Sequence, residues 1–299
     1  MYIYNYSCPF KFQSHLSLRM YLYVYTMVSP KFSKLLLFPL TNGFLWQQRS
    51  YTKTIGQKNI DVYEARNAKT SMIFFTGLFN QMPNFIYSDL LKSLSREGIT
   101  CYSVQDSIDA KVYSFIESNT KTSTPVIAAH SSGSVPALEL ASIAPIEKII
   151  LFDPVGLPSI PPQQYTLKRA TDVMFVNAEL SYEWRGLSDI PFIPSTFAIT
   201  EKDLNTPANI SCISSKYHGH GDILNNFWAD VSANTGIIRG HEERDERVNQ
   251  NYRDWIIEQV VSFIESTNQD TNHQDTNHQD TSLTKNENIS NVNVTVHSV

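Results

Sequence analysis

The amino-acid sequence predicts an α/β fold, in which a mostly parallel central sheet is covered by helices on both faces. Between residues 52 and 266, short apolar runs of strand length alternate with longer segments whose apolar residues recur at helical spacing. This alternation is typical of parallel sheets, whose strands are buried on both faces and therefore read as continuous apolar runs. In sheets of this kind, reactive residues gather where the strands end.

The folded part is expected to begin with a hairpin, formed by strands at 52–55 and 59–64 around a glycine turn. The strongly apolar run at 71–76 then predicts a buried strand. A helix is expected over 87–94, because the apolar residues of that segment fall on one face. Gly98 follows it and supplies the residue that a helix C-terminus prefers.

The alternation continues to the end of this region. Residues 99–104 predict a strand and residues 109–117 a helix. Later apolar runs predict strands at 126–129, 148–153, 172–179 and 210–214. Residues 252–264 carry large apolar side chains at helical spacing and predict a closing helix. The short link from Asp153 to Asp172 leaves no room for a large helical cap, so none is expected.

The turn after the strand at 126–129 carries the sequence Ala129-His130-Ser131-Ser132-Gly133. A serine with small residues two positions before and after it, between a strand and a helix, is the nucleophile-elbow pattern. The turn is so sharp that only small residues fit at those two positions. Ser132 and Ser134 fail this test, because they would place His130 and Pro136 at a small position. Ser131 is therefore the candidate nucleophile.

Backbone N–H groups near this turn are candidate donors to an oxyanion. The helix expected over 132–142 begins directly after Ser131, so the N–H of Ser132 would face an oxyanion formed there. A second donor is expected in the loop after the strand at 71–76, at the N–H of Leu78. His130 is expected to pack around the turn rather than to act as a base.

A serine hydroxyl becomes a good nucleophile when a histidine takes its proton and an acid orients that histidine. In one known chain order the serine precedes the acid, and the acid precedes the histidine. Within the folded region expected over 52–266, the histidines after the last predicted strand are His218, His220 and His241. His241 sits in a charged run typical of solvated surface, and His218 and His220 are two residues apart, so only one of them can face the serine. For the acid, Asp153 and Glu179 each end a predicted strand, and both stay open.

Three motifs resemble the α/β-hydrolase superfamily: Ala-His-Ser131-Ser-Gly, Leu-Phe-Asp153-Pro-Val-Gly and Gly-His220-Gly-Asp-Ile-Leu. More narrowly, they are similar to chlorophyllase-like and dienelactone-hydrolase-type esterases. The resemblance spans residues 55–265 and implies that Ser131 is the nucleophile, Asp153 the acid and His220 the base. It favours Asp153 over Glu179, although most of the superfamily places its acid where Glu179 stands. The chain departs from the family's pattern at Ala129, Ser134 and Thr76. Because of these departures, the resemblance implies no particular substrate.

Composition narrows the class of protein. The 299 residues are 41% hydrophobic, which suits one large packed domain. A formal net charge of −5 gives no electrostatic footprint for nucleic acid. Cys8, Cys101 and Cys212 are widely spaced, so neither disulfides nor a metal site is expected, and no cofactor is implied. No apolar run is long enough to span a bilayer.

The two ends differ from the middle of the chain. Residues 1–51 contain no Asp or Glu but several Lys and Arg, a composition typical of organelle presequences. Arg49-Ser50-Tyr51-Thr52 resembles the cleavage pattern of mitochondrial precursors, so a mitochondrial protein is expected; a cytoplasmic one with an N-terminal apolar arm is the alternative. Residues 267–299 include a polar repeat and predict a disordered tail, which leaves 52–266 as the folded domain.

These observations predict a serine hydrolase that cleaves a carboxylic ester through an acyl-enzyme on Ser131. The substrate would be a lipid, a small-acyl ester or a thioester. Two alternatives stay open: acyl transfer to a second alcohol by the same residues, and a hydrolase-fold binding protein without turnover. Apolar residues that could wall the acyl pocket are Phe79, Met82, Phe85, Leu157, Ile160 and those of 184–197.

Overall fold

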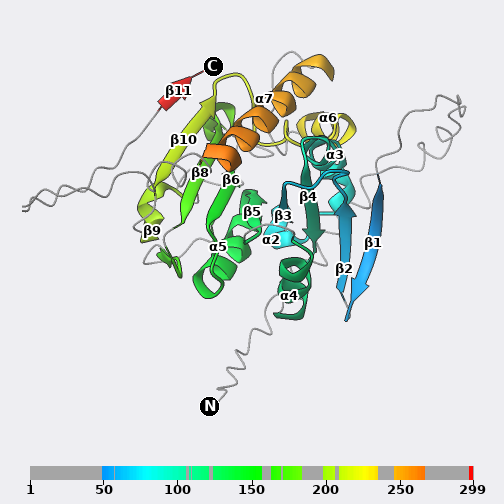
Figure 1. The fold of residues 1–299 in the computed structure, drawn as a ribbon. Helices are drawn as coiled ribbons and strands as arrows, with labels where there is room; N and C mark the ends of the chain where they lie inside the picture. Colours follow the sequence, from blue (N-terminus) through cyan, green and yellow to red (C-terminus); the bar gives the residue numbers. More distant parts are fainter. Residues whose placement is uncertain are drawn as a thin grey trace, which may run out of the picture. The chain divides into compact units, whose positions relative to one another are not determined.

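A nine-stranded sheet in the order β1-β2-β4-β3-β5-β6-β8-β10-β11 organises the chain (Figure 1). The computed structural model describes residues 49–56, 58–105, 108, 110–120, 124–156, 163–169, 171–183, 198–205, 209–234, 246–266 and 296–298. All of them belong to the unit Gln48–Val299. The strands of the sheet are β1 (Ser50–Ile55), β2 (Lys58–Tyr63), β3 (Thr70–Phe75), β4 (Ile99–Val104), β5 (Val126–His130), β6 (Lys148–Phe152), β8 (Asp172–Ala178), β10 (Ile210–Ser215) and β11 (Val296–Ser298).

Most neighbouring strands of this sheet run parallel. β1 and β2 form an antiparallel hairpin and β2 is antiparallel to β4, whereas every pairing from β4 to β11 is parallel. β7 (Tyr165–Thr166) and β9 (Leu204–Asn205) pair in a separate two-stranded sheet. Because parallel strands end at the same edge, the residues that follow β3, β5, β6 and β8 are brought together there.

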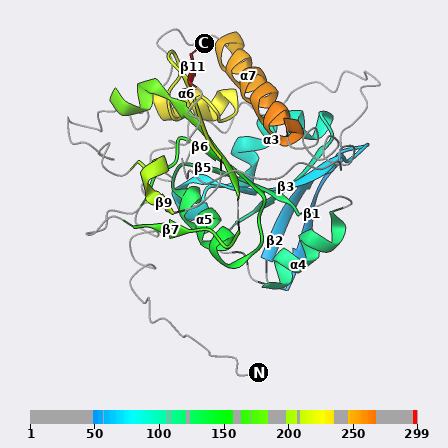
Figure 2. The same cartoon turned by 60° about the vertical axis from the view of Figure 1, so that its left-hand side comes forward.

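Helices cover both faces of the sheet (Figure 1 and Figure 2). The helices are α2 (Gly77–Asn80), α3 (Ser88–Arg96), α4 (Ala110–Asn119), α5 (Ser134–Ile143), α6 (Asn226–Asn234) and α7 (Glu246–Glu265), with 3-10 turns η2 (Asn84–Tyr87), η3 (Ser131–Gly133), η4 (Glu179–Glu183) and η7 (Glu201–Asp203). Apolar residues of α4 and α5 pack on one face of the sheet, and those of α3, α6 and α7 on the other. The predicted α/β fold with helices on both faces is confirmed.

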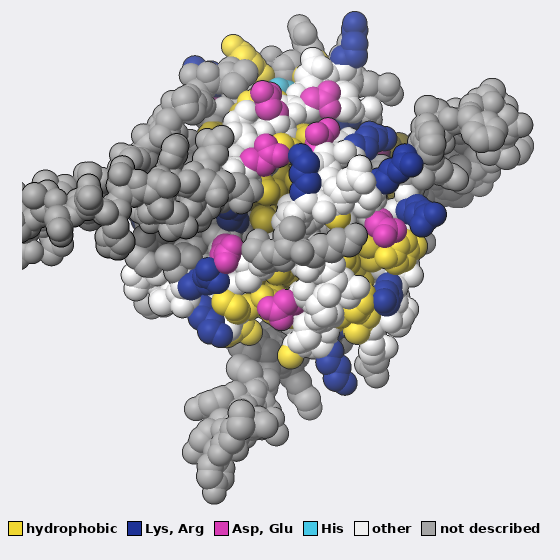
Figure 3. All heavy atoms as spheres, viewed as in Figure 1, with side chains coloured by type: hydrophobic (Ala, Val, Ile, Leu, Met, Phe, Trp, Pro, Cys, Tyr) yellow, Lys and Arg dark blue, Asp and Glu magenta, His cyan; other side chains and the backbone are white. Residues whose placement is uncertain are grey.

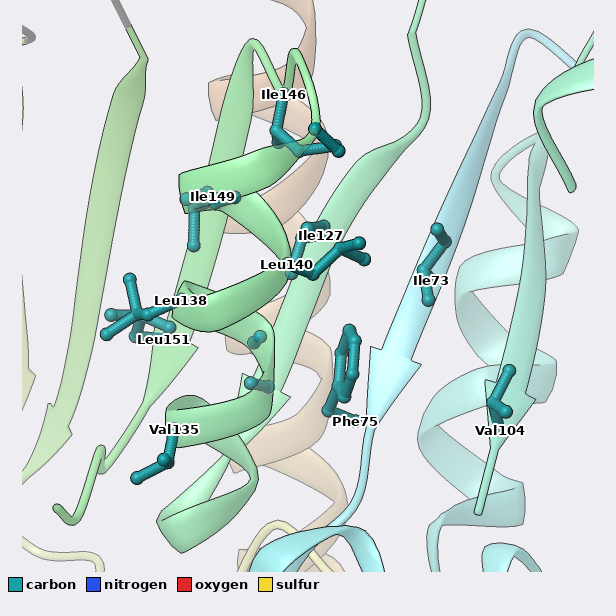
Figure 4. Packing of buried hydrophobic residues seen from close by; sticks show 14 of the residues in the cluster. Ile73, Phe75, Val104, Ile127, Val135, Leu138, Leu140, Ile146, Ile149 and Leu151 are labelled. Carbon is teal, nitrogen blue, oxygen red and sulfur yellow. The ribbon is translucent and has the colours of Figure 1, made fainter. Parts of the chain in front are cut away.

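The strands are continuous apolar runs because both of their faces are covered. In β3, Ile73 and Phe75 join the cluster under α5, and Met72 and Phe74 join the cluster under α3 and α7. None of the four is more than 1% exposed. Figure 4 shows side chains of α5 packed over the first cluster. Burial of each such side chain contributes about 1.5–3 kcal/mol, which makes the sheet a rigid support for the residues at its edge.

Some boundaries differ from those expected. The helix predicted over 132–142 begins as the 3-10 turn η3 before α5. α7 starts at Glu246 and not at the predicted residue 252. The prediction missed its first turns because they are polar and show no apolar periodicity. α6 and the β7–β9 pair were not predicted. Gly98 does follow α3 with a φ of 91°, the left-handed conformation expected of a helix-ending glycine.

The chain ends are described only in part. β1 starts at Ser50 and the N–H of Glu64 donates to the carbonyl of Arg49 at 3.0 Å, so the predicted leader, 1–51, overlaps the first strand. Of the predicted tail, 267–299, the structure describes Val296–Ser298, which pairs with β10. The mitochondrial address and the cleavage of the leader stay predictions. The segment 157–162, part of the link on which the expected lack of a cap depends, lies outside the described residues.

The face of the described chain that Figure 3 shows is of mixed character. On the face shown in Figure 3, Lys and Arg side chains lie among Asp and Glu side chains and small apolar areas. Within the described ranges, no helix has the length and apolar character that crossing a membrane requires.

Candidate active site

The turn between β5 and α5 is as tight as the sequence pattern predicts. Ser131 has a φ of 56°, a left-handed conformation that is uncommon for a residue with a side chain. Ala129, two residues earlier, is fully buried. A Cβ atom placed on Gly133, two residues later, would lie 2.2 Å from the carbonyl oxygen of Thr76. The position of Gly133 therefore accepts no side chain, and Ala129 is fully enclosed, as the steric condition of a nucleophile elbow requires.

Replacing Gly133 with alanine should therefore destabilise the protein by about 3 kcal/mol or more, because overpacking against backbone cannot be relieved by a rotamer change. The φ of Gly133 is −63°, so backbone preference plays no part in this cost. Urea unfolding followed by circular dichroism measures the effect. Gly56→Ala is the control: it has a φ of 63° but no atom within 4 Å of the added Cβ, so it should lose only about 1–2 kcal/mol. A Gly133→Ala protein as stable as Gly56→Ala would contradict the close packing.

Left-handed backbone conformations gather at the candidate site. Among the described residues, the non-glycine residues with positive φ are Leu78 (50°), Asn80 (65°), Ser131 (56°) and Asp153 (44°). Three of the four are residues that the sequence analysis selects for the site. The fourth, Asn80, is buried and its Oδ1 accepts the N–H of Thr76 at 2.8 Å, which fixes the turn that carries Leu78. Each such residue costs on the order of 1–3 kcal/mol, a strain that persists where the surrounding structure enforces it.

The structure brings Asp153 and His220 together. The Nδ1 atom of His220 lies 3.2 Å from Oδ2 of Asp153, and both side chains are about nine-tenths buried. The carboxylate of Asp153 also accepts the N–H of Ala178 at 2.8 Å and the hydroxyl of Ser181. These contacts orient the carboxylate toward the imidazole. The other candidate acid, Glu179, accepts a hydrogen bond from the hydroxyl of Ser214 at 2.8 Å instead.

The other two candidate histidines do not share this position. Nδ1 of His218 lies 2.6 Å from the hydroxyl of Ser215, and its ring stacks on Tyr252 with centroids 4.2 Å apart. As expected from their spacing, His218 and His220 thus have different surroundings. His241 lies outside the described residues.

The loop that carries His220 is fixed at both of its ends. Oδ2 of Asp222 accepts the N–H of Gly219 at 2.8 Å, which closes the loop on itself. Arg253 of α7, only 1% exposed, donates to the carbonyl of Leu224 at 2.8 Å. Arg253 is not among the residues selected from the sequence, although an arginine within the apolar face of a predicted helix is a signal for a buried polar contact.

His130 packs around the elbow, as expected. It is 3% exposed and its ring lies against that of His220, with centroids 4.5 Å apart. Its Nδ1 is 2.8 Å from the hydroxyl oxygen of Tyr87, and its Nε2 is 3.0 Å from the carbonyl oxygen of His220. Burial, which is the largest effect, and the neighbouring charge of His220 set the pKa of His130 well below its usual value, against the opposing effect of the hydrogen bond to that carbonyl. His130 is therefore neutral at pH 7.

The two expected oxyanion donors lie in the first turns of their helices. A Cβ atom placed on Gly77 would lie 3.5 Å from Cβ of Ser131, so the loop after β3 runs directly beside the elbow. The N–H of Gly77 donates to the hydroxyl oxygen of Tyr87 at 3.0 Å. The N–H of Leu78 lies in the first turn of α2, where it has no acceptor within the helix. Ser132 lies at the corresponding place in η3.

The expected pocket walls are described only in part. Met82 packs against the core and Phe85 is 55% exposed. The side chain of Phe79 lies outside the described part of the structure, as do Leu157, Ile160 and 184–197. In the ranges that the structure covers, no His, Cys, Asp or Glu residues cluster in a way that could hold a metal ion.

No protein-family model matches the chain, and no curated protein does. Solved structures do resemble it. MGS-M1, an α/β-hydrolase enzyme from a Medee basin deep-sea metagenome library, is 13% identical with a TM-score of 0.46, over 72% of this chain and 98% of that one. A dienelactone hydrolase from Anabaena variabilis is 10% identical with a TM-score of 0.41, over 71% and 97%.

A third similar structure is the thioesterase domain from the curacin biosynthetic pathway. It is 13% identical with a TM-score of 0.30, over 38% of this chain, and the chain spans about half of it, 48%. Hydrolases of the superfamily that the three sequence motifs resemble are thus among the similar structures. Since so few residues are shared, the substrates of these proteins say nothing about the substrate of this chain.

Proposed function

We propose that this chain is a serine hydrolase of the α/β-hydrolase superfamily, which cleaves a carboxylic ester through an acyl-enzyme on Ser131. One observation carries the proposal: a histidine held by a buried carboxylate lies beside a strained serine turn. His220 pairs with Asp153, and its ring lies against that of His130, the residue directly before Ser131, at a tilt of 35°. Groups that are far apart in the chain and arranged in this way have one well-known use, the activation of a serine hydroxyl.

In the proposed reaction, Oγ of Ser131 attacks the ester carbonyl carbon while Nε2 of His220 takes the hydroxyl proton. Asp153 keeps the proton of His220 on Nδ1 and stabilises the imidazolium that forms. The carbonyl oxygen becomes an oxyanion, to which the N–H groups of Leu78 and Ser132 donate. The imidazolium then protonates the leaving alcohol, and the C–O bond to it breaks. A water molecule, deprotonated by Nε2 of His220, attacks the acyl carbon. The bond from that carbon to Oγ of Ser131 then breaks, His220 returns the proton to Oγ, and the acid is released.

The substrate class proposed is an ester or thioester with an apolar acyl group. Its support is the side chain of Leu78, which is 44% exposed beside the proposed oxyanion position, and the exposed ring of Phe85 in the following turn. Apolar side chains retained at a reaction site favour apolar groups of a ligand.

A fluorophosphonate probe tests the proposal, because it reacts only with an activated serine. The purified protein should be labelled once per chain and should hydrolyse p-nitrophenyl esters, with a preferred acyl length that identifies the substrate class. Folded protein, verified by circular dichroism, that is neither labelled nor active would instead be a binding protein. Adding a primary alcohol to the assay and measuring the new ester detects acyl transfer.

A further inference from the structure

Two buried side chains connect the loop that carries Leu78 to the loop that carries His220. The N–H of Gly77, directly before Leu78, donates to the hydroxyl oxygen of Tyr87 at 3.0 Å. That hydroxyl lies 2.8 Å from Nδ1 of His130. On its other side, Nε2 of His130 lies 3.0 Å from the carbonyl oxygen of His220. The three contacts form a continuous path between two loops that flank Ser131.

The positions of the protons on this path follow from the chemistry of its ends. A carbonyl oxygen can only accept, so Nε2 of His130 must carry a proton and donate to His220. In a neutral imidazole Nδ1 is then an acceptor, and the hydroxyl of Tyr87 donates to it. The Tyr87 oxygen accepts in turn from Gly77. Every donor on the path has one acceptor, and both ring nitrogens of His130 are used.

The members of the path have little freedom to move. Tyr87 is 1% exposed and packs against Phe74 of β3, with ring centroids 5.0 Å apart. His130 ends the central strand β5, and its ring is packed between Tyr87 and His220. Burial raises the pKa of Tyr87, despite the opposing effect of the Gly77 hydrogen bond, so its hydroxyl stays protonated. Such a satisfied buried network fixes its members in one arrangement.

We propose that Tyr87 and His130 are positioning residues, which set the distance between the oxyanion donor at Leu78 and the base at His220. This inference rests on the proposed function, because it assigns the two residues a role in the same reaction. Neither would touch the substrate. His130 holds the backbone of His220, and Tyr87 holds the backbone beside Leu78. Because Tyr87 is itself bound to His130, both loops are held to the end of β5, and their separation is fixed.

Two substitutions at His130 separate the two ends of the path. In His130→Asn the side-chain amide reaches the place of Nδ1, so the contact with Tyr87 is kept and the donor to His220 is lost. In His130→Gln the amide reaches the place of Nε2, so the donor to His220 is kept. A displacement of about 1 Å at a catalytic group lowers the rate roughly 100-fold. We therefore expect His130→Asn to lower kcat roughly 100-fold with KM nearly unchanged, and His130→Gln to recover most of that loss.

Tyr87→Phe completes the test, since it removes the link to Gly77 and leaves the ring in place. If the path acts as one unit, the double variant Tyr87→Phe/His130→Asn should lose no more activity than the worse single variant. Losses that multiply in the double variant would overturn the proposal. So would a His130→Asn protein with the wild-type kcat, or one whose loss His130→Gln does not recover.

Thr171→Val is the matched control for stability. Thr171 is 2% exposed and its hydroxyl donates to the carbonyl of Ile146 at 2.8 Å, next to the first residue of β8 and so away from the edge that carries the site. Thr171→Val should lower the melting temperature about as much as His130→Asn does, because both remove a buried hydrogen bond. It should leave kcat unchanged. If wild-type protein shows no hydrolysis or fluorophosphonate labelling, the proposed function itself has failed. If wild-type protein is active, the outcomes for His130 judge the positioning role alone.

Discussion

Ser131→Ala should abolish ester hydrolysis and fluorophosphonate labelling, with a fall in kcat of about 10⁶-fold, as when the nucleophile of a serine hydrolase is removed. Alanine lacks the oxygen that would carry the acyl group, so no covalent intermediate can form. The substitution leaves the fold intact, because alanine and serine carry similar strain at a φ of 56°. Initial rates with the preferred p-nitrophenyl ester measure the effect.

The control for this prediction is Ser142→Ala, in the last turn of α5, the helix that follows the elbow. The hydroxyl of Ser142 donates to the carbonyl of Leu138 at 2.9 Å and has no part in the proposed reaction. Its activity should equal that of the wild type. Substantial hydrolysis by Ser131→Ala would mean that another residue is the nucleophile, and the proposed mechanism would be wrong.

Asp153→Asn should lower kcat by about 10⁴-fold while the protein stays folded. Its side-chain NH₂ cannot accept the Nδ1 proton of His220, so the imidazole is no longer kept in the form whose Nε2 accepts the Ser131 proton. Asparagine suits the site in other respects: it tolerates the φ of 44°, and its oxygen can still accept the N–H of Ala178. The kcat of each purified variant and its circular dichroism spectrum measure the two effects separately.

Glu179→Gln is the comparison that decides between the two carboxylates. Glutamine keeps an oxygen that can accept from the hydroxyl of Ser214, so this variant should stay within a few-fold of wild-type activity. If Glu179→Gln lost activity and Asp153→Asn did not, Glu179 would be the acid. The assignment of Asp153 would then have to be abandoned.

The sheet and the elbow could be predicted because each leaves a local signal. Strands buried on both faces need continuous apolar residues, as in β3 and β5, and a sharp turn needs small residues on both sides of its serine. Gly133, one of the small residues that select Ser131 in the sequence, is required in the structure because a Cβ atom there would meet the carbonyl oxygen of Thr76. Both signals are short-range, so no knowledge of the tertiary fold is required to read them.

The choice between Asp153 and Glu179 has no such signal. Both residues follow neighbouring parallel strands, and which carboxylate turns toward His220 depends on the backbone turn at Asp153 and on the hydroxyl of Ser181. The role of Tyr87 was hidden for a different reason. On a helical projection Tyr87 belongs to an apolar face, so its aromatic ring alone accounts for its burial. No feature of the sequence indicates the hydrogen bond between its hydroxyl and His130.

The spread of the site along the chain also shapes how the protein reaches its working state. Its members extend from Leu78 to His220, and parallel strands meet only after a helix-length connection has crossed between them. Segments of that span close against a large entropic penalty, which delays non-local pairing relative to helix formation. A nascent or partly melted chain can therefore possess its helices before the proposed site exists, so turnover would report that the strands from β3 to β10 have assembled.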